Sequence, residues 1–199
     1  MPLRAQARPR ASSAVVAAAA LLHDEPYYLG GLWALTHWRL SEQQYTAQLD
    51  AFVDRSHQPR TLANARVRFH RVPAARIDDV STPAPVEGVS VRVSSREGSL
   101  LDLLDYPDLA GTMRAALGFV VIALEKIDVG ELVRLAARIS RASTCQRLGV
   151  LLERRGVAPA RLTPLRRRVA ETRSLTSMVP GASRRGSVNT RWRVVENDR

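Results

Sequence analysis

The sequence contains almost no cysteine or lysine: Cys145 and Lys126 are the single examples of each among 199 residues. One thiol excludes an intramolecular disulfide framework and any zinc site built from several thiolates. The longest stretches without a polar or charged side chain, 14–22 and 115–124, have nine and ten residues, whereas a membrane-spanning helix needs about 20. We therefore expect a protein of the reducing cytoplasm with no membrane span.

Sequence motifs of nucleotide or metal chemistry are also missing. There is no GxxxxGK[ST] phosphate loop, and Gly30-Gly31 lacks the third glycine and the preceding strand of a dinucleotide site. Metal ligands on one helix face need a fixed spacing, which no two of the four histidines have: His23, His37, His57 and His70. No cofactor, metal ion or small-molecule substrate is therefore expected.

Candidate catalytic side chains are few. Asp102, Asp105 and Asp108 form the one dense group of carboxylates. We interpret the first two as the exposed, solvated face of a helix, because nothing nearby in the sequence supplies a complementary acid, base or ligand. Cys145 falls on the apolar side of another predicted helix, where a structural thiol is expected rather than a nucleophile. These features predict a protein that is not an enzyme.

Positive charge collects at one end of the chain. The net charge is +11, from 30 basic and 19 acidic residues. Residues 1–137 hold 15 of each, whereas residues 138–199 hold 15 basic and 4 acidic residues. Such a region attracts an acidic partner or a phosphate backbone. The side chains expected to bind there, with the indole available for stacking on a base, are Arg161, Arg166, Arg167, Arg168, Arg173, Arg184, Arg185, Arg191, Trp192 and Arg193.

Alternating apolar and polar residues predict half-buried strands at 47–53, 66–70 and 89–94. Between the last two, residues 78–88 contain Pro83 and Pro85 and are expected to form an exposed loop. A final strand at 191–195 is expected to return to this early sheet. Together these segments predict a small mixed or antiparallel sheet.

Helical periodicity predicts helices at 12–22, 32–38, 96–105, 109–124, 129–139, from Ser143 to a C-cap at Gly156, and 164–173. N-cap spacings support four of the starts: Ser94 with Glu97, Asp128 with Glu131, Ser143 with Gln146, and Thr163 before Pro164. The predicted fold class is α+β, with the small sheet packed against an array of four to five helices.

Several segments, taken in order, resemble the AbiEi family, the antitoxins of type IV toxin-antitoxin systems. They are YYLGGLWAL at 27–35 followed by LSEQ at 40–43, REGSLLDLL at 96–104, YPDLAG at 106–111, RLGVLLE at 147–153 and RWRV at 191–194. Their order and spacing cover almost everything from Tyr27 to Asn197. The resemblance implies a domain that carries antitoxin activity against a nucleotidyltransferase-like toxin, typically without a tight complex between the two.

The family pattern also includes an N-terminal winged helix-turn-helix that binds the promoter of the operon. Only 26 residues precede Tyr27 here, too few for a winged helix, so no DNA-reading residues carry over. We expect a leader over 1–25, partly disordered or helical, and an antitoxin domain over 26–199. The alternative for the start is a signal peptide, because three arginines precede its alanine-rich stretch.

The leading hypothesis is thus a cytoplasmic, non-enzymatic antitoxin related to transcriptional autoregulators. A second hypothesis is a nucleic-acid-binding module that contacts DNA or RNA through the arginine-rich region at 138–199. A third is a remnant of a regulator that has lost its winged helix.

Overall fold

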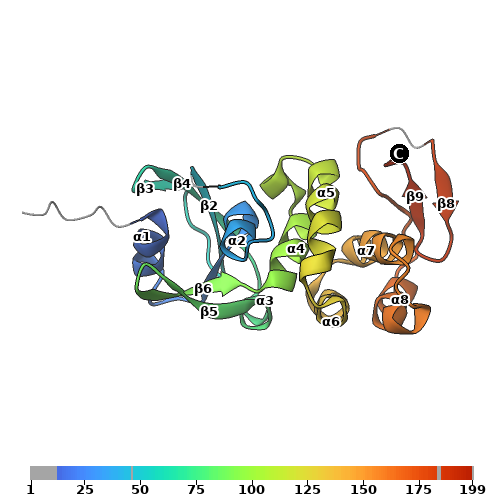
Figure 1. Ribbon diagram of the computed structural model, residues 1–199, viewed down its shortest axis with the longest axis horizontal. Helices are drawn as coiled ribbons and strands as arrows, with labels where there is room; N and C mark the ends of the chain where they lie inside the picture. The colour runs from blue at the N-terminus through green and yellow to red at the C-terminus, as the bar shows by residue number, and fades with distance from the viewer. Residues whose placement is uncertain (1–12, 46, 183–184, 199) are drawn as a thin grey trace, which may run out of the picture.

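The computed structural model describes residues 13–45, 47–182 and 185–198. Most of the expected leader, residues 1–12, lies outside this range. The fold class is α+β, as predicted: a six-stranded mixed sheet is followed by an array of helices and then by a separate three-stranded sheet. Figure 1 shows these three parts in order along the long axis of the molecule.

The large sheet has the strand order β3-β4-β2-β1-β6-β5. Its strands are β1 (Tyr27–Gly30), β2 (Gln48–Val53), β3 (Arg60–Leu62), β4 (Ala65–Arg71), β5 (Ser81–Val86) and β6 (Val89–Ser94). The three predicted strands are confirmed as β2, β4 and β6. The sheet is mixed because β2 runs parallel to β4, and β1 parallel to β6, whereas the other neighbours are antiparallel.

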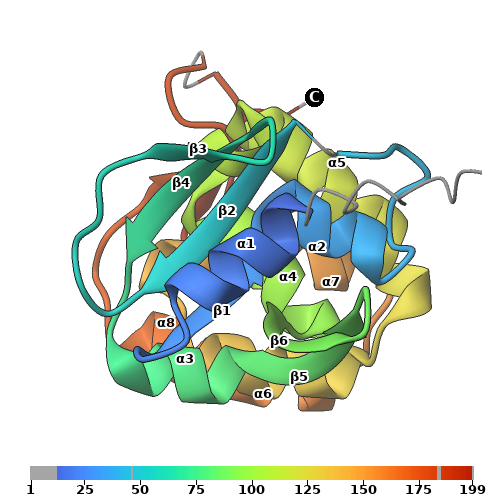
Figure 2. The same cartoon turned by 90° about the vertical axis from the view of Figure 1, so that its left-hand side faces the viewer.

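One face of this sheet is covered by α1 (Ala14–Leu21), which lies across the strands in Figure 2. The apolar side chains of α1 pack with Leu29, Leu49 and Val93 of the sheet. The other face packs on α2 (Gly31–His37) and on the helical array, where Tyr28 and Phe52 join the larger hydrophobic core. Burial on both faces explains why β1 has no alternating pattern.

The expectation of an exposed loop at 78–88 is wrong. Residues Ala74–Val80 form α3, and Ser81–Val86 form β5, which pairs with β6 along its whole length. Pro83 and Pro85 fit there because β5 is an edge strand. Alternate N–H groups of an edge strand point away from its only neighbour and need no donor.

The helical array comprises α4 (Arg96–Asp105), η1 (Pro107–Ala110), α5 (Met113–Ala123), η2 (Leu124–Lys126), α6 (Val129–Ile139), α7 (Ala142–Arg154), η3 (Pro159–Leu162) and α8 (Thr163–Ala170). The predicted bounds of α4 and α6 are confirmed. The helix expected at 109–124 begins four residues late, because Gly111 breaks the chain with a φ of 82°. The C-cap at Gly156, with a φ of 75°, is confirmed.

Of the predicted N-caps, Asp128 is confirmed, since its side chain accepts from the amides of Gly130 and Glu131. The other three are wrong. Ser95, not Ser94, accepts from the amide of Gly98 at the start of α4. Neither Ser143 nor Thr163 caps a helix: α7 already begins at Ala142, and α8 begins at Thr163 itself and ends at Ala170, short of the predicted 173.

The last strand does not return to the large sheet, contrary to expectation. The C-terminal sheet consists of β7 (Thr176–Ser177), β8 (Ser187–Asn189) and β9 (Val194–Glu196), in the order β7-β9-β8. It lies at the opposite end of the molecule (Figure 1), where Trp192 and Val194 join the core around α7. Within the described residues, no helix has both the length and the apolar character that crossing a bilayer requires.

Candidate functional site

The indole predicted to stack on a base is not available. Trp192 is 0% exposed, and its ring lies against Gly149 in α7. Its Nε1 donates to the carboxylate of Glu153 at 2.9 Å. The expectation that Trp192 contacts a nucleic acid is therefore wrong, because the side chain is part of the core that fixes the C-terminal sheet.

The predicted arginines lie in different environments. Arg168 pairs with Glu171, and Arg191 with Glu153, so each already has a carboxylate partner. Arg193 is half-buried in the turn before β9. Arg185 is exposed, and Arg184 lies outside the described residues.

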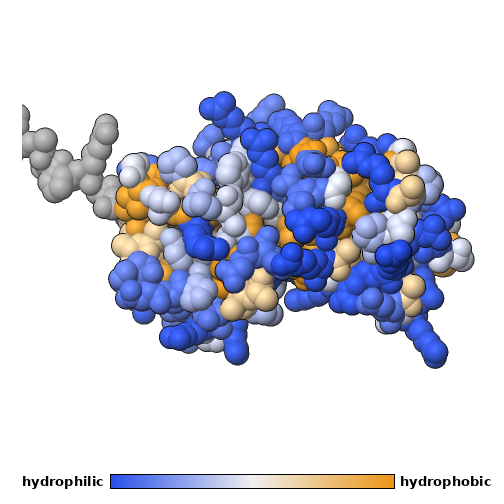
Figure 3. Space-filling view, turned by 90° about the horizontal axis from the view of Figure 1, so that it is seen from below, coloured by the Kyte–Doolittle hydropathy of each residue, from blue (hydrophilic) through white to orange (hydrophobic). Residues whose placement is uncertain are grey.

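The remaining four arginines lie in and beside α8 and are exposed: Arg161, Arg166, Arg167 and Arg173. Among the described residues, none of the four has an ion pair with a carboxylate. We call this group the α8 arginine face. Figure 3 views the molecule from below and shows hydrophilic side chains over the end that holds α8.

The carboxylates predicted to be solvated are instead buried. Asp102 is 0% and Asp105 4% exposed, and both bind the guanidinium of Arg76. Nη2 of Arg76 lies 2.9 Å from Oδ1 of Asp102, and its Nη1 lies 2.8 Å from Oδ2 of Asp105. Together with Tyr28, these residues form what we call the central ionic cluster. It joins the large sheet to the helical array.

Both carboxylate oxygens of Asp102 have hydrogen-bond donors at this position. Oδ1 also accepts from the hydroxyl of Tyr28 at 2.9 Å, and Oδ2 accepts from the hydroxyl of Ser94 at 3.0 Å. Burial raises the pKa of Asp102, and the neighbouring Arg76 only partly opposes that shift. Burial likewise raises the pKa of Tyr28 well above its ordinary value. A buried ionic cluster of this kind ordinarily has a structural role.

Asp105 serves as a cap for a helix other than its own. Its Oδ1 accepts from the amide of Arg141, at the start of α7, and from the hydroxyl of Thr144 at 2.7 Å. Its Oδ2 accepts from the hydroxyl of Ser140 at 3.1 Å. The first turn of α7 contains no acidic residue, so Asp105 supplies the negative charge that a helix N-terminus favours.

The position of Asp102 carries a signal that sequence reasoning missed. Leucines occupy both sides of it, at 100–101 and 103–104, so most of the surface of this helix is apolar. An acidic residue within an apolar helix is buried and paired more often than solvated. Its partner Arg76 comes from α3, a helix that the sequence did not predict, so the pair itself was not visible.

Two cavities adjoin the helical array. One, of about 430 Å³, lies beside the central ionic cluster and is lined by Tyr106, Arg138 and Arg141, among others. The guanidiniums of Arg76 and Arg141 lie over the ring of Tyr106, at 5.7 and 5.3 Å from its centroid. Arg138 is paired with Asp79. The polar groups that line this cavity are therefore already engaged in contacts with one another.

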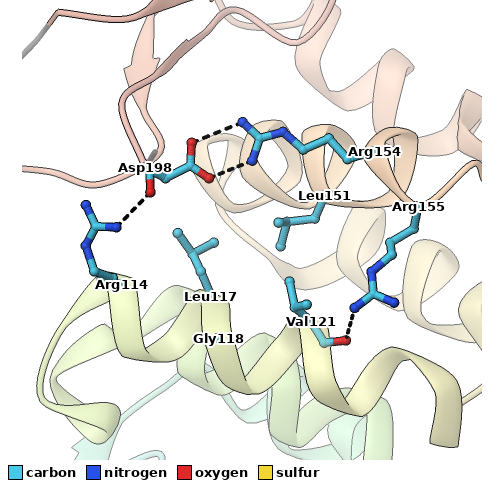
Figure 4. Close-up of a pocket in the computed structure, with 8 residues that line it drawn as sticks. All are labelled: Arg114, Leu117, Gly118, Val121, Leu151, Arg154, Arg155 and Asp198. Atoms are coloured by element: carbon cyan, nitrogen blue, oxygen red, sulfur yellow. Dashed lines mark hydrogen bonds and ion pairs between the residues drawn. The ribbon is translucent and has the colours of Figure 1, made fainter.

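The second cavity, of about 380 Å³, is a groove between α5 and α7, which we call the α5–α7 groove (Figure 4). Leu117, Val121 and Leu151 point into it from the two helices. At one end, Arg154 binds the carboxylate of Asp198. Its other lining residues are Arg114, Gly118 and Arg155.

The remaining reactive side chains form no recognisable centre. In the described part of the chain, no three His, Cys, Asp or Glu side chains gather as metal ligands. Burial raises the pKa of the Cys145 thiol to about 12, and its Sγ donates to the carbonyl of Ala136. A thiol of this kind is not a nucleophile at neutral pH.

No family model and no curated protein matches the sequence. Among solved structures, the chain is similar to the Rv2827c protein from Mycobacterium tuberculosis, with a TM-score of 0.59 and 16% sequence identity. The similarity covers 90% of this chain and 65% of that protein. At this identity the likeness shows a shared fold and no more.

Proposed function

We propose that this chain is a non-enzymatic antitoxin of the type IV class that acts in the cytoplasm against a nucleotidyltransferase-like toxin. One observation carries the proposal: the segments that resemble AbiEi antitoxins contact one another in the structure. They lie far apart in the sequence and pack together in the folded chain.

The first contact joins the segments 27–35 and 96–104. The hydroxyl of Tyr28 donates to Asp102 at 2.9 Å. A Cβ on Gly30 would lie 3.0 Å from Oδ2 of Asp102 and 2.7 Å from the ring of Phe52, so the position next to the cluster requires a small residue. The packing around the Tyr28–Asp102 contact thus requires glycine at position 30.

The second contact joins the segments 147–153 and 191–194. Trp192 packs on Gly149 and donates to Glu153, so three of the matching residues meet at one point. The fold is shared with Rv2827c over 90% of this chain. These contacts support a family relationship, and the antitoxin activity is what that relationship implies.

The test is co-expression with the neighbouring toxin gene. We expect growth to recover when the chain is induced together with the toxin. A variant that replaces Gly149 with Leu serves as the control, because it removes the seat of Trp192 and with it the folded domain. Growth that stays arrested while the wild-type chain is folded and soluble would refute the antitoxin function.

A second candidate function, nucleic-acid binding, is favoured by the α8 arginine face. Arginines without carboxylate partners are free to contact phosphates, and such binding weakens steeply as salt rises because counterions are released. Fluorescence anisotropy with labelled duplex DNA and RNA measures it. We expect the double variant of Arg166→Ala and Arg167→Ala to lose binding, and the charge-matched Arg55→Ala and Arg60→Ala to retain it. If both double variants lose binding equally, the α8 arginine face is not the nucleic-acid contact.

A further inference from the structure

We propose that two copies of this chain associate through the outer side of α5, with their α5 helices packed antiparallel around a twofold axis. The surface, which we call the α5 outer face, consists of Ala115, Gly118, Phe119 and Ile122, at the i, i+3, i+4 and i+7 spacing of one helix face. The proposal is independent of the antitoxin function, because it rests only on this helix.

The sequence of α5 is apolar on both sides. Its inner side, which includes Leu117 and Val120, is buried in the helical array. No polar or charged side chain occurs anywhere between Arg114 and Glu125, the longest such run in the chain. A helix that is apolar all round is normally buried all round. The sequence therefore predicts cover for the outer side of α5 as well.

The outer side is nevertheless open to solvent in the single chain. Ile122 is 64% exposed, the highest value among the large apolar residues that the structure describes. Gly118, which also lines the α5–α7 groove, is exposed, and a Cβ built on it would meet no atom within 4 Å. Ala115 and Phe119 are half-buried beside them. Contiguous apolar surface of this kind marks a protein interface.

The order of small and large residues along the face suits a second copy. The small residues Ala115 and Gly118 come first along the helix, and the large residues Phe119 and Ile122 follow. With the twofold axis near Gly118, an antiparallel pair places Phe119 of each copy over Gly118 of the other, and Ile122 over Ala115. Large side chains then fill the space over small ones, as close packing requires. A parallel pair would set Ile122 against Ile122 and leave a gap between the two glycines.

The charges at the two ends of the face favour the same arrangement. Arg114 and Glu125 border the apolar run and stand about three helical turns apart, so they project from the same side of the helix. In an antiparallel pair, Arg114 of each copy approaches Glu125 of the other, whereas a parallel pair would bring like charges together.

Both charged side chains can take part without a large cost. Arg114 donates to the main-chain carbonyl of Asp198. The side chain of Glu125 is 79% exposed, and its contact with Arg155 is long, at 3.4 Å. Exposed pairs of this kind contribute little energy, so exchanging one for a contact across the interface is nearly neutral. The charges therefore set the orientation of the two helices, and the apolar contact supplies the affinity.

The association should be weak, because one helix face per copy buries less than the about 1,200–2,000 Å² of a standard interface. We expect a dissociation constant on the order of tens of micromolar. Sedimentation velocity of the full chain, over concentrations that bracket this value, measures it. The average mass should rise from that of a monomer toward that of a dimer. A monomer at every concentration would overturn the proposal.

Two matched variants locate the surface. Ile122→Glu brings a charge into the apolar contact of both copies and should weaken the association at least tenfold. Val188→Glu introduces the same charge at another exposed apolar residue, 51% exposed on β8, and should leave the association unchanged. Circular dichroism confirms that both variants are folded. Equal effects of the two variants would place the contact elsewhere and overturn the proposal.

Engineered cysteines test the antiparallel order. Chains with Ala115→Cys are mixed with tagged chains carrying Ile122→Cys and oxidised, while the native Cys145 stays buried and does not compete. We expect disulfides mainly between one chain of each kind, because the two positions face each other across the twofold axis. Cross-links mainly between identical chains would show parallel helices, and equal yields in all combinations would show random collision. Either result would overturn the arrangement.

Discussion

Trp192 occupies the space in which a side chain on Gly149 would stand. A Cβ built on Gly149 would lie 2.2 Å from the indole, far inside contact distance. The two residues are separated by most of the C-terminal region, and their contact anchors the β7-β9-β8 sheet on α7. The close contact between Trp192 and Gly149 should therefore affect the free energy of unfolding.

Gly149→Ala should lower the free energy of unfolding by about 1–3 kcal/mol, because the rigid indole must shift in a packed core. The matched control is Gly118→Ala, the same change inside α5 with open space around it. It should raise the free energy of unfolding by about 1 kcal/mol through helix propensity. Urea denaturation of both variants measures the difference. Equal changes of the same sign would contradict the packing at Gly149.

The central ionic cluster predicts a strong effect at Arg76. Arg76→Met leaves two buried carboxylates without their cation and should cost about 3–5 kcal/mol of unfolding free energy. Adding Asp102→Asn should recover part of that loss, because one of the two charges is removed. Arg134→Met, which breaks an exposed pair with Glu131, should change stability by less than about 1 kcal/mol. If the losses at Arg76 and Asp102 simply add, the two residues do not interact as described.

Two buried aspartates predict opposite pH dependences. Burial raises the pKa of Asp102, so its folded state binds a proton more tightly than the unfolded chain. Its contribution to stability is greatest below its ordinary pKa near 3.8 and is lost as the pH rises through the folded value.

For Asp50, burial acts to raise the pKa, but hydrogen bonds from His70 and Arg68 outweigh it and lower the pKa overall. Its contribution is therefore present above pH 3.8 and lost as the pH falls through the folded pKa. The stability of the wild type minus that of Asp50→Asn should rise with pH across the acid range, whereas the same difference for Asp102→Asn should fall. Chemical denaturation at several acid pH values tests both signs, and parallel profiles would contradict the two environments.

The single thiol predicts a simple probe of unfolding. Because Cys145 is buried and its pKa is raised to about 12, a thiol reagent at pH 8 should react on the order of a thousandfold more slowly with the native chain than with the unfolded chain. The reaction in urea should follow the unfolding transition seen by circular dichroism. Rapid labelling without denaturant would show that α7 opens locally.

Much of the fold was predictable where one periodicity dominates a segment. The sequences of β2, β4 and β6 alternate with period two, and α4 and α6 have clear ends, so their residues alone indicate their structure. The segments whose structure was not predicted from the sequence take that structure from contacts with other segments. The edge position of β5, which permits Pro83 and Pro85, exists only once β6 is in place.

The site was less predictable, because the partners of charged residues are distant in sequence. Asp102 looks solvated until Arg76 is placed beside it, and Trp192 looks like a stacking platform until Gly149 is found beneath it. By contrast, the exposed arginines of the α8 arginine face follow from local sequence. A charged side chain stays exposed to solvent without a specific partner, so its position can be predicted from the local sequence.

The central claim, that this folded domain is the antitoxin, is tested most directly by growth rate during toxin induction, measured with chains of graded stability. Wild type and Gly118→Ala should restore growth, and rescue should fall in step with the folded fraction for Gly149→Ala and Arg76→Met. Continued arrest with a fully folded wild-type chain, or full rescue by an unfolded variant, would contradict the claim.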